Sequence, residues 1–244
     1  MEERQVVLTL RSKTALIMDR DNISFAEEIV SWTKDPTNAD AQRAGDDRAP
    51  AWGWLGRLHL GADGLVSIPE SMLAPCIRGA GAMIPHPTAR GGKTLKEQSQ
   101  SGLSFIETHH PVWLPPDDAQ GWHPIVYHEL EQKLRQEEDF AQHEAVARRL
   151  GFILDVRRAK PQYNRSHVRV RPMFAPWYCV CAVTVTDEVF TDKLVLDLFN
   201  LAGTRKGLGN WRPSVGKAGP FGQFTAIGGV PADLATAMKG WAKA

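Results

Sequence analysis

Apolar and polar positions alternate with changing period along the chain, and the period predicts the first elements. Residues 6–10, Val-Val-Leu-Thr-Leu, are apolar and β-prone and predict a buried strand. Ser24 is a helix-capping residue type, and Phe25, Ile29 and Trp32 then recur at helical spacing. A strand followed by a short helix is therefore expected at this end of the chain.

The middle of the chain is less regular. An Asp63-Gly64 turn between apolar runs predicts a hairpin, and residues 72–84 favour a helix rich in small side chains. Prolines and glycines then interrupt the pattern up to residue 124, whereas residues 125–150 lack both and predict a helix or a helical pair. We expect an irregular and helical insertion at about 85–150.

The last third has the clearest periodicity. Residues 168–189 alternate as a strand region does, and Thr191 is placed to cap a helix that ends at Gly203. A glycine-rich loop, 203–222, then leads into a strand over 221–227, and a short helix is expected at 231–244. This order of elements predicts an α+β fold, a single domain over 1–244 with a ferredoxin-like or RRM-like antiparallel sheet and insertions.

Composition places the chain among ordinary globular proteins. Its 244 residues are 43% hydrophobic and 23% charged, which excludes global disorder and fibrous repeats. Three cysteines cannot all pair within one chain, and no apolar run approaches the ~20 residues of a membrane span. The sequence therefore favours a cytoplasmic protein without membrane contact.

Charge is unevenly distributed, although the net charge is only +1. Residues 148–171 hold eight Lys or Arg against one acid, while residues 129–144 hold six acids against two bases. A neutral total can hide a basic groove. Strand periodicity places Arg169 and Arg171 on one side, as a phosphate-binding track or as a solvated face, and the candidate arginines of this stretch are Arg157, Arg158, Arg169 and Arg171.

The glycine-rich loop carries the most specific chemistry. Glycines let backbone amides approach a ligand, cations contact phosphate, and a tryptophan offers a stacking face. The alternative is a connection kept soluble by its cations. The loop runs from helix to strand and lacks the P-loop ending, which excludes a nucleotide-cofactor site. Its candidate binding residues are Arg205, Lys206, Gly207, Gly209, Trp211, Arg212 and Lys217, and a weaker basic set is Arg78, Arg90, Lys93 and Lys96.

The histidines do not have metal-ligand spacing. His109 and His110 are adjacent, but there is no His-Glu-x-x-His motif and no paired Cys-x-x-Cys, so neither a metal nor another cofactor is expected. Acid–base cleavage of RNA by His109, His110 or His167 beside arginines stays open as an alternative.

Three stretches resemble a known superfamily. Residues 203–213, GTRKGLGNWRP, followed by 219–224, GPFGQF, are similar to a loop-and-strand signature of phage and prophage proteins related to the RAMP superfamily, which includes backbone subunits of CRISPR effector complexes. Residues 8–18 and 68–79 are similar to further parts of it. The resemblance implies an RRM-like core that binds RNA or single-stranded DNA, head-to-tail self-association along the strand, and a bacterial cytoplasm if the chain is phage-encoded.

Three hypotheses follow. The first is a non-catalytic protein that coats single-stranded RNA or DNA as repeated copies. The second is a metal-independent endoribonuclease of RAMP type, and the third is an interaction protein that docks into another nucleoprotein complex.

Overall fold

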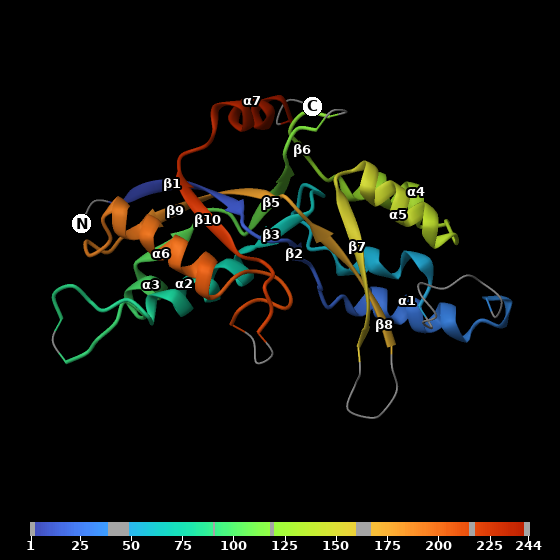
Figure 1. Cartoon of the computed structure of the whole chain (residues 1–244), viewed down its shortest axis with the longest axis horizontal. Coiled ribbons are helices and arrows are strands. Elements are labelled where there is room, and N and C mark those ends of the chain that lie inside the picture. Colours follow the sequence, from blue (N-terminus) through green and yellow to red (C-terminus); the bar gives the residue numbers. More distant parts are fainter. Residues whose placement is uncertain are drawn as a thin grey trace. The chain divides into compact units, whose positions relative to one another are not determined.

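The computed structural model describes residues 3–38, 49–89, 91–117, 120–159, 167–214 and 218–241. The chain divides into two compact units, each made from segments that are far apart in the sequence (Figure 1). Residues 85–125 of the predicted insertion belong to the first unit, and residues 126–150 belong to the second. The first unit comprises Met1–Leu16, Leu60–Ile125 and Pro176–Ala244, and the second comprises Ile17–His59 and Val126–Ala175.

The first unit is built on an antiparallel sheet with the order β10-β1-β9-β5-β3, to which β4 and β6 add at β9 and β5. Along the chain, β1, α2, β5, β9, α6 and β10 run strand, helix, strand, strand, helix, strand. Since β1 lies between β9 and β10, this is the ferredoxin-like arrangement. The predicted α+β class is therefore confirmed. The elements are β1 (Arg4–Ser12), β3 (Ser67–Pro69), α2 (Glu70–Gly81), α3 (Gln98–Ser101), β4 (Leu103–Phe105), β5 (His109–Leu114), β6 (His123–Pro124), β9 (Tyr178–Val185), α6 (Asp192–Arg205), β10 (Phe224–Gly228) and α7 (Ala232–Trp241).

One face of this sheet holds the core of the first unit. In β9, Cys179 and Cys181 are buried, while the alternate residues are only half-buried. Helix α6 packs closely on β10, because a Cβ at Gly203 would lie 2.1 Å from the carbonyl oxygen of Phe224. Helices α2 and α6 pack against each other, and the Cys76 Sγ lies 3.7 Å from the Ala202 carbonyl oxygen. The opposite face, called the open face below, is half-buried along β9, and Thr9 of β1 is buried on it.

The second unit contains a smaller sheet in which β8 lies between β2 and β7. Trp54, Phe152 and Phe174 fill its core, with rings 5.2 to 5.9 Å apart. The predicted helical pair is confirmed as α4 and α5. The elements of this unit are α1 (Ile23–Lys34), η1 (Pro36–Asn38), η3 (Ala51–Arg57), α4 (Tyr127–Leu134), α5 (Phe140–Arg149), β7 (Phe152–Ala159) and β8 (His167–Phe174), with β2 (Leu16–Ile17) at the boundary.

Local expectations differ from the structure at several places. Asn22, not Ser24, caps α1, because its side chain accepts from the Phe25 N–H. The hairpin around Asp63 is reduced to an isolated bridge between Leu60 and Val66. Within the described ranges, no helix is long and apolar enough to cross a membrane.

Candidate nucleic-acid interface

The chain changes direction at Gly207 and Gly209, directly after the end of α6. Gly207 and Gly209 have φ of 65° and 70°, the left-handed conformation that glycine adopts without strain. The Gly207 N–H donates to the Ala202 carbonyl at 3.0 Å, and the Gly209 N–H points at the Met72 Sδ at 3.1 Å. These two N–H groups are therefore used within the fold. Both glycines set the path of the loop.

Two further glycines allow the loop to pack on itself. A Cβ at Gly222 would lie 1.8 Å from the Leu208 carbonyl oxygen, and a Cβ at Gly219 would lie 2.1 Å from that of Trp211. Leu208 is buried, and its N–H donates to the Gly222 carbonyl at 2.9 Å. The described part of the loop is thus closely packed around Leu208.

Trp211 lies at the outer turn of this loop in a strained conformation. Its φ is 58°, and it is the non-glycine residue with positive φ in the described part of the chain. Left-handed backbone costs a bulky L-residue about 1–2 kcal/mol. The Asn210 Oδ1 accepts from the Trp211 N–H at 2.8 Å, and the indole is 36% exposed beside Phe221, with ring centroids 6.1 Å apart. Strained backbone of this kind clusters at active sites, ligand clamps and switch regions.

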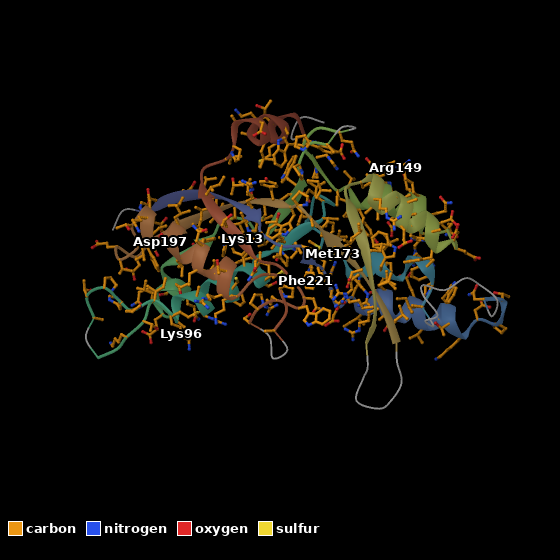
Figure 2. All side chains as sticks on the ribbon, in the orientation of Figure 1. Lys13, Lys96, Arg149, Met173, Asp197 and Phe221 are labelled. Carbon is orange, nitrogen blue, oxygen red and sulfur yellow. The ribbon has the colours of Figure 1, made fainter. Side chains whose placement is uncertain are left out.

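Cations gather around the C-terminal ends of α2 and α6, next to the loop. The Lys13 Nζ donates to the Thr204 Oγ1 at 3.3 Å, and the stem of Lys206 lies over Gly79, beside the exposed Arg78. Lys13, at the exit of β1, and Phe221, at the end of the loop, are labelled in Figure 2. We call this set the helix-end cluster: Lys13, Arg78, Arg205, Lys206 and Arg212.

The helix-end cluster is not neutralised by carboxylates. None of its members forms an ion pair within the described ranges. Arg212 instead donates to the Gly209 carbonyl at 2.8 Å, which orients the guanidinium beside the loop. The sequence contains no Asp or Glu in residues 71–96 or 198–232, the two stretches that supply four of the five members. The cluster is therefore a surface of uncompensated positive charge.

The charge of the cluster reaches the buried Cys76 thiol between the two helices. Burial raises the pKa of Cys76 to about 12, and the positive charges of Arg212 and Lys206 act in the opposite direction. Both cations are therefore near α2, and the Lys206 stem contacts it at Gly79.

The other candidate residues of this unit lie apart from these contacts. Lys93 and Lys96 are exposed in the segment after α2. Lys217 and Arg90 lie outside the described residues.

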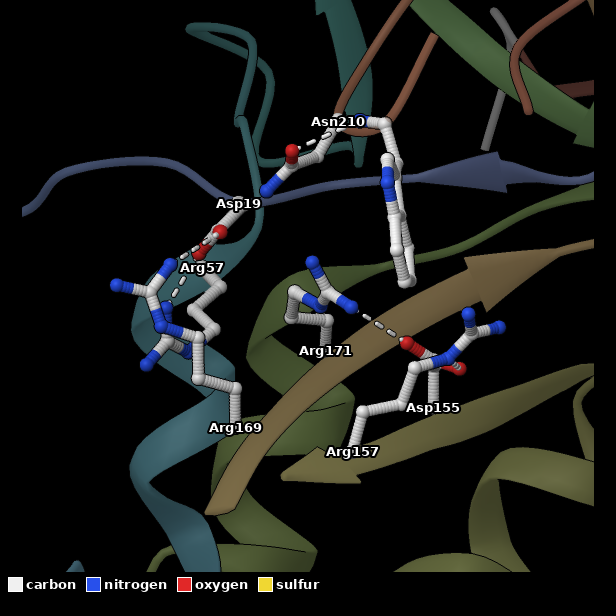
Figure 3. Close-up of polar contacts among 8 residues, drawn as sticks. Asp19, Arg57, Asp155, Arg157, Arg169, Arg171 and Asn210 are labelled. Carbon is white, nitrogen blue, oxygen red and sulfur yellow. Dashed lines mark hydrogen bonds and ion pairs between the residues drawn. The ribbon is translucent and has the colours of Figure 1, made fainter. Parts of the chain in front are cut away.

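The arginines of the second unit have a different electrostatic setting, shown in Figure 3. The Asp155 carboxylate accepts from the Arg157 Nε at 2.6 Å and from the Arg171 Nη2 at 2.7 Å. Arg169 pairs with Asp19 at 3.5 Å, and Asp19 also binds Arg57. The predicted face of Arg169 and Arg171 does form, and the register adds Arg157 to it, but two carboxylates share this face. Only the backbone of Arg158 is described.

Sequence reasoning missed the partners Asp19 and Arg57. Asp155 carried a detectable signal, because residues 155 and 157 share one face of a strand. Asp19 lies far from the hairpin in sequence, and nothing in its neighbourhood indicated this contact.

The histidines are dispersed among structural roles. His110 is buried in β5 against Phe105, and burial lowers its pKa to about 4, with a further contribution from His109. The His143 Nδ1 accepts from the Trp54 Nε1–H at 3.1 Å. Among the described residues, no three His, Cys, Asp or Glu side chains lie together as metal ligands do. The side chain of His167 lies outside the described part.

Comparison with known proteins gives similarity to solved structures. No family model and no curated protein matches the sequence. Among solved structures, the chain is similar to one described as the crystal structure of Cmr6 from Pyrococcus furiosus, at 10% identity and a TM-score of 0.33. The alignment covers 93% of this chain and 100% of that one. A score this low assigns neither fold nor function, so the function proposed below rests on the residues of this chain.

Proposed function

We propose that the chain binds single-stranded nucleic acid, RNA or single-stranded DNA, without cleaving it, and that copies associate head to tail along the strand. The helix-end cluster contacts phosphates, and Trp211 stacks on a base. One observation carries this proposal: five cations that pair with no carboxylate of the described residues border a loop that holds an exposed tryptophan in a strained conformation. The similarity of residues 203–213 and 219–224 to the RAMP signature supports it.

A single strand fits this surface better than a small anion does. Cations on an exposed surface bind a polymer through several phosphates at once, whereas a small ligand needs an enclosing pocket. Single-strand sites combine such cations with an aromatic side chain on which bases stack, and the loop has both. The hairpin arginines contribute less, because Asp19 and Asp155 would repel a phosphate at the same face.

The test is a charge-removal variant, Arg78→Gln, Arg205→Gln and Lys206→Gln, measured by fluorescence anisotropy with a labelled oligouridine and the matching oligodeoxythymidine. Affinity should fall about tenfold or more. If all three contact phosphate, the dependence of log K on log salt should become shallower by about 2, since each single-strand contact contributes about 0.7.

The matched control removes three charges elsewhere: Lys133→Gln, Arg148→Gln and Lys193→Gln. Arg148 and Lys193 pair with Glu144 and Asp197, so this variant should bind within about twofold of the wild type. Equal losses in both variants would show a nonspecific effect of net charge and reject the assignment. Labelled RNA that stays intact over a long incubation supports the non-catalytic part, and cleavage in EDTA would reject it.

A further inference from the structure

The open face of the first unit's sheet holds a second group of aromatic and cationic side chains. Arg11 on β1 and Tyr178 on β9 are direct partners in the antiparallel register and therefore project from the same face. This is the face opposite α2 and α6, since the neighbouring Leu10 and Cys179 are both buried in the core. Trp122 packs against Tyr178 from a separate segment, with ring centroids 4.8 Å apart at 88°.

Helix α7 supports the aromatic pair of Trp122 and Tyr178 through a hydrogen bond to Trp122. The Trp122 Nε1–H donates to the Asp233 Oδ2 at 2.8 Å in the first turn of that helix. This hydrogen bond lowers the pKa of the exposed Asp233 carboxyl, because the ionised carboxylate is the better hydrogen-bond acceptor. Asp233 is thus bound to the indole, and the edge-to-face contact fixes the orientation of Tyr178.

Arg11 is exposed and makes a loose contact with the Tyr178 ring. Its Cζ lies 6.0 Å from the Tyr178 ring centroid, the outer limit of a cation–π contact, whereas Arg135 in the second unit lies 3.7 Å from the Trp52 ring. Arg11 forms no ion pair within the described ranges. Because this contact is loose, the Arg11 guanidinium can move away to bind a phosphate. The Tyr178 ring is then available to stack on another planar group.

Arg11 also connects this face to the helix-end cluster. Two residues further along, Lys13 belongs to that cluster, and two residues of extended chain span only about 7 Å. Positive charge therefore continues from the end of α6 to the edge of the open face. The occupant that fits cations, an aromatic ring and an extended path is a polymer with alternating phosphates and bases.

We propose that Tyr178, supported by Trp122, stacks on a nucleobase of the bound strand, and that Arg11 binds an adjacent phosphate. This inference rests on the proposed function and adds a second contact point on the sheet. It differs from the loop site in what it recognises, because a stacking site requires the base itself, whereas the helix-end cluster requires only the backbone.

The experiment compares a fluorescein-labelled oligouridine with the same oligonucleotide carrying abasic sites, using the full chain. Wild type should prefer the base-containing strand. Tyr178→Leu should weaken binding of that strand about fivefold or more, leave abasic-strand affinity unchanged, and so remove most of the preference. Tyr178→Phe keeps the ring and should bind within about twofold of the wild type, as should Trp241→Leu, which removes an exposed aromatic of α7.

The outcomes separate the two proposals. If Tyr178→Leu binds the base-containing strand like the wild type while the helix-end variant does not, the stacking site is wrong and the proposed function stands. If wild type binds no strand at all, both are wrong. Tyr178→Thr places a strand-forming residue at the same position, so a loss shared by this variant and Tyr178→Leu, with unchanged unfolding midpoints, supports stacking. The inference would also be overturned if Tyr178→Leu abolished binding of a protein partner and left the affinity for the nucleic-acid strand unchanged. Tyr178 would then belong to a protein-binding surface.

Discussion

Trp211 has a left-handed backbone conformation, which is costly for a bulky side chain. Asparagine adopts this conformation at lower cost than tryptophan does. The backbone path of the loop, with φ of 58° at this position, therefore does not require an indole. The strain is offset by packing on Phe221, which still leaves the ring 36% exposed. The proposed stacking role gives a reason for a large side chain in a position that disfavours it.

Trp211→Asn tests this role. The exchange should change the free energy of unfolding by no more than about 1 kcal/mol, because relief of backbone strain opposes the loss of ring contacts. Strand affinity should fall about fivefold or more, as stacking losses do. Denaturant unfolding and anisotropy measure the two effects. Strand affinity equal to wild type, with a destabilisation above about 2 kcal/mol, would reduce Trp211 to a packing residue.

At the scale of elements, the β7–β8 hairpin depends on a buried ion pair. The side chains of Asp155 and Arg171 are 6% and 7% exposed, and they face each other across the register. Removing one member of a buried pair leaves an uncompensated charge, which typically costs about 3–5 kcal/mol. The buried pair therefore gives Arg171 a role in stability that does not depend on a ligand.

Asp155→Leu should accordingly destabilise the protein by about 3 kcal/mol in denaturant unfolding, since Arg171 stays buried without its carboxylate. The double variant Asp155→Leu with Arg171→Met should recover most of that loss, because apolar residues of similar size often replace a buried pair without penalty. Additive losses in the double variant would contradict this account.

Periodicity predicted the strand region that holds β8 and β9, and it missed β5 and β7. Alternation in β9 gave the correct faces for Cys179 and Cys181. It did not show that residues 168–189 form two strands in different units, although Pro176 between them cannot donate to a ladder. Strand β5 was missed because its His-His-Pro start lacks β-prone side chains, and its pairing to β9 and β3 decides its conformation.

The same limit applies to the candidate interface. Composition drew attention to the loop and to Arg205, Lys206 and Trp211, and the structure gathers the first two with Arg78 and Lys13. The sequence could not show which cations have carboxylate partners, because that depends on contacts such as Arg169 with Asp19, which are 150 residues apart. Tyr178 was overlooked as a binding residue, since its relation to Arg11 exists only in the sheet register.

At the scale of the whole molecule, each unit buries one histidine whose pKa is lowered by burial. The pKa of His110 falls from 6.5 to about 4, so the unfolded chain takes up the proton first as pH falls. His143 behaves in the same direction, since its Nδ1 must stay unprotonated to accept from Trp54. The His110 contribution to stability is present above about pH 6.5 and is lost as pH falls toward about 4. The His143 contribution, which burial produces, is lost in the same direction.

Denaturant unfolding at about pH 7 and pH 4 should show this loss. His110 alone contributes about 3 kcal/mol, at about 1.4 kcal/mol for each pH unit of its shifted range. The His110→Met variant, which cannot take up the proton, should have a pH dependence smaller by that amount. The same dependence in wild type and variant would mean that His110 titrates normally in the folded protein.

The interleaved segments of the two units also affect how the chain folds during its synthesis. Strand β1 pairs with β9 and β10, so its partners follow it by more than 160 residues. At about 5–20 residues per second, a ribosome takes on the order of 10–30 s to deliver them. Throughout that interval the apolar strand has no ladder to join. Such distant pairing slows folding and exposes strand edges, so the yield of native protein during synthesis should depend on temperature and on chaperones that shield β1 until β9 emerges.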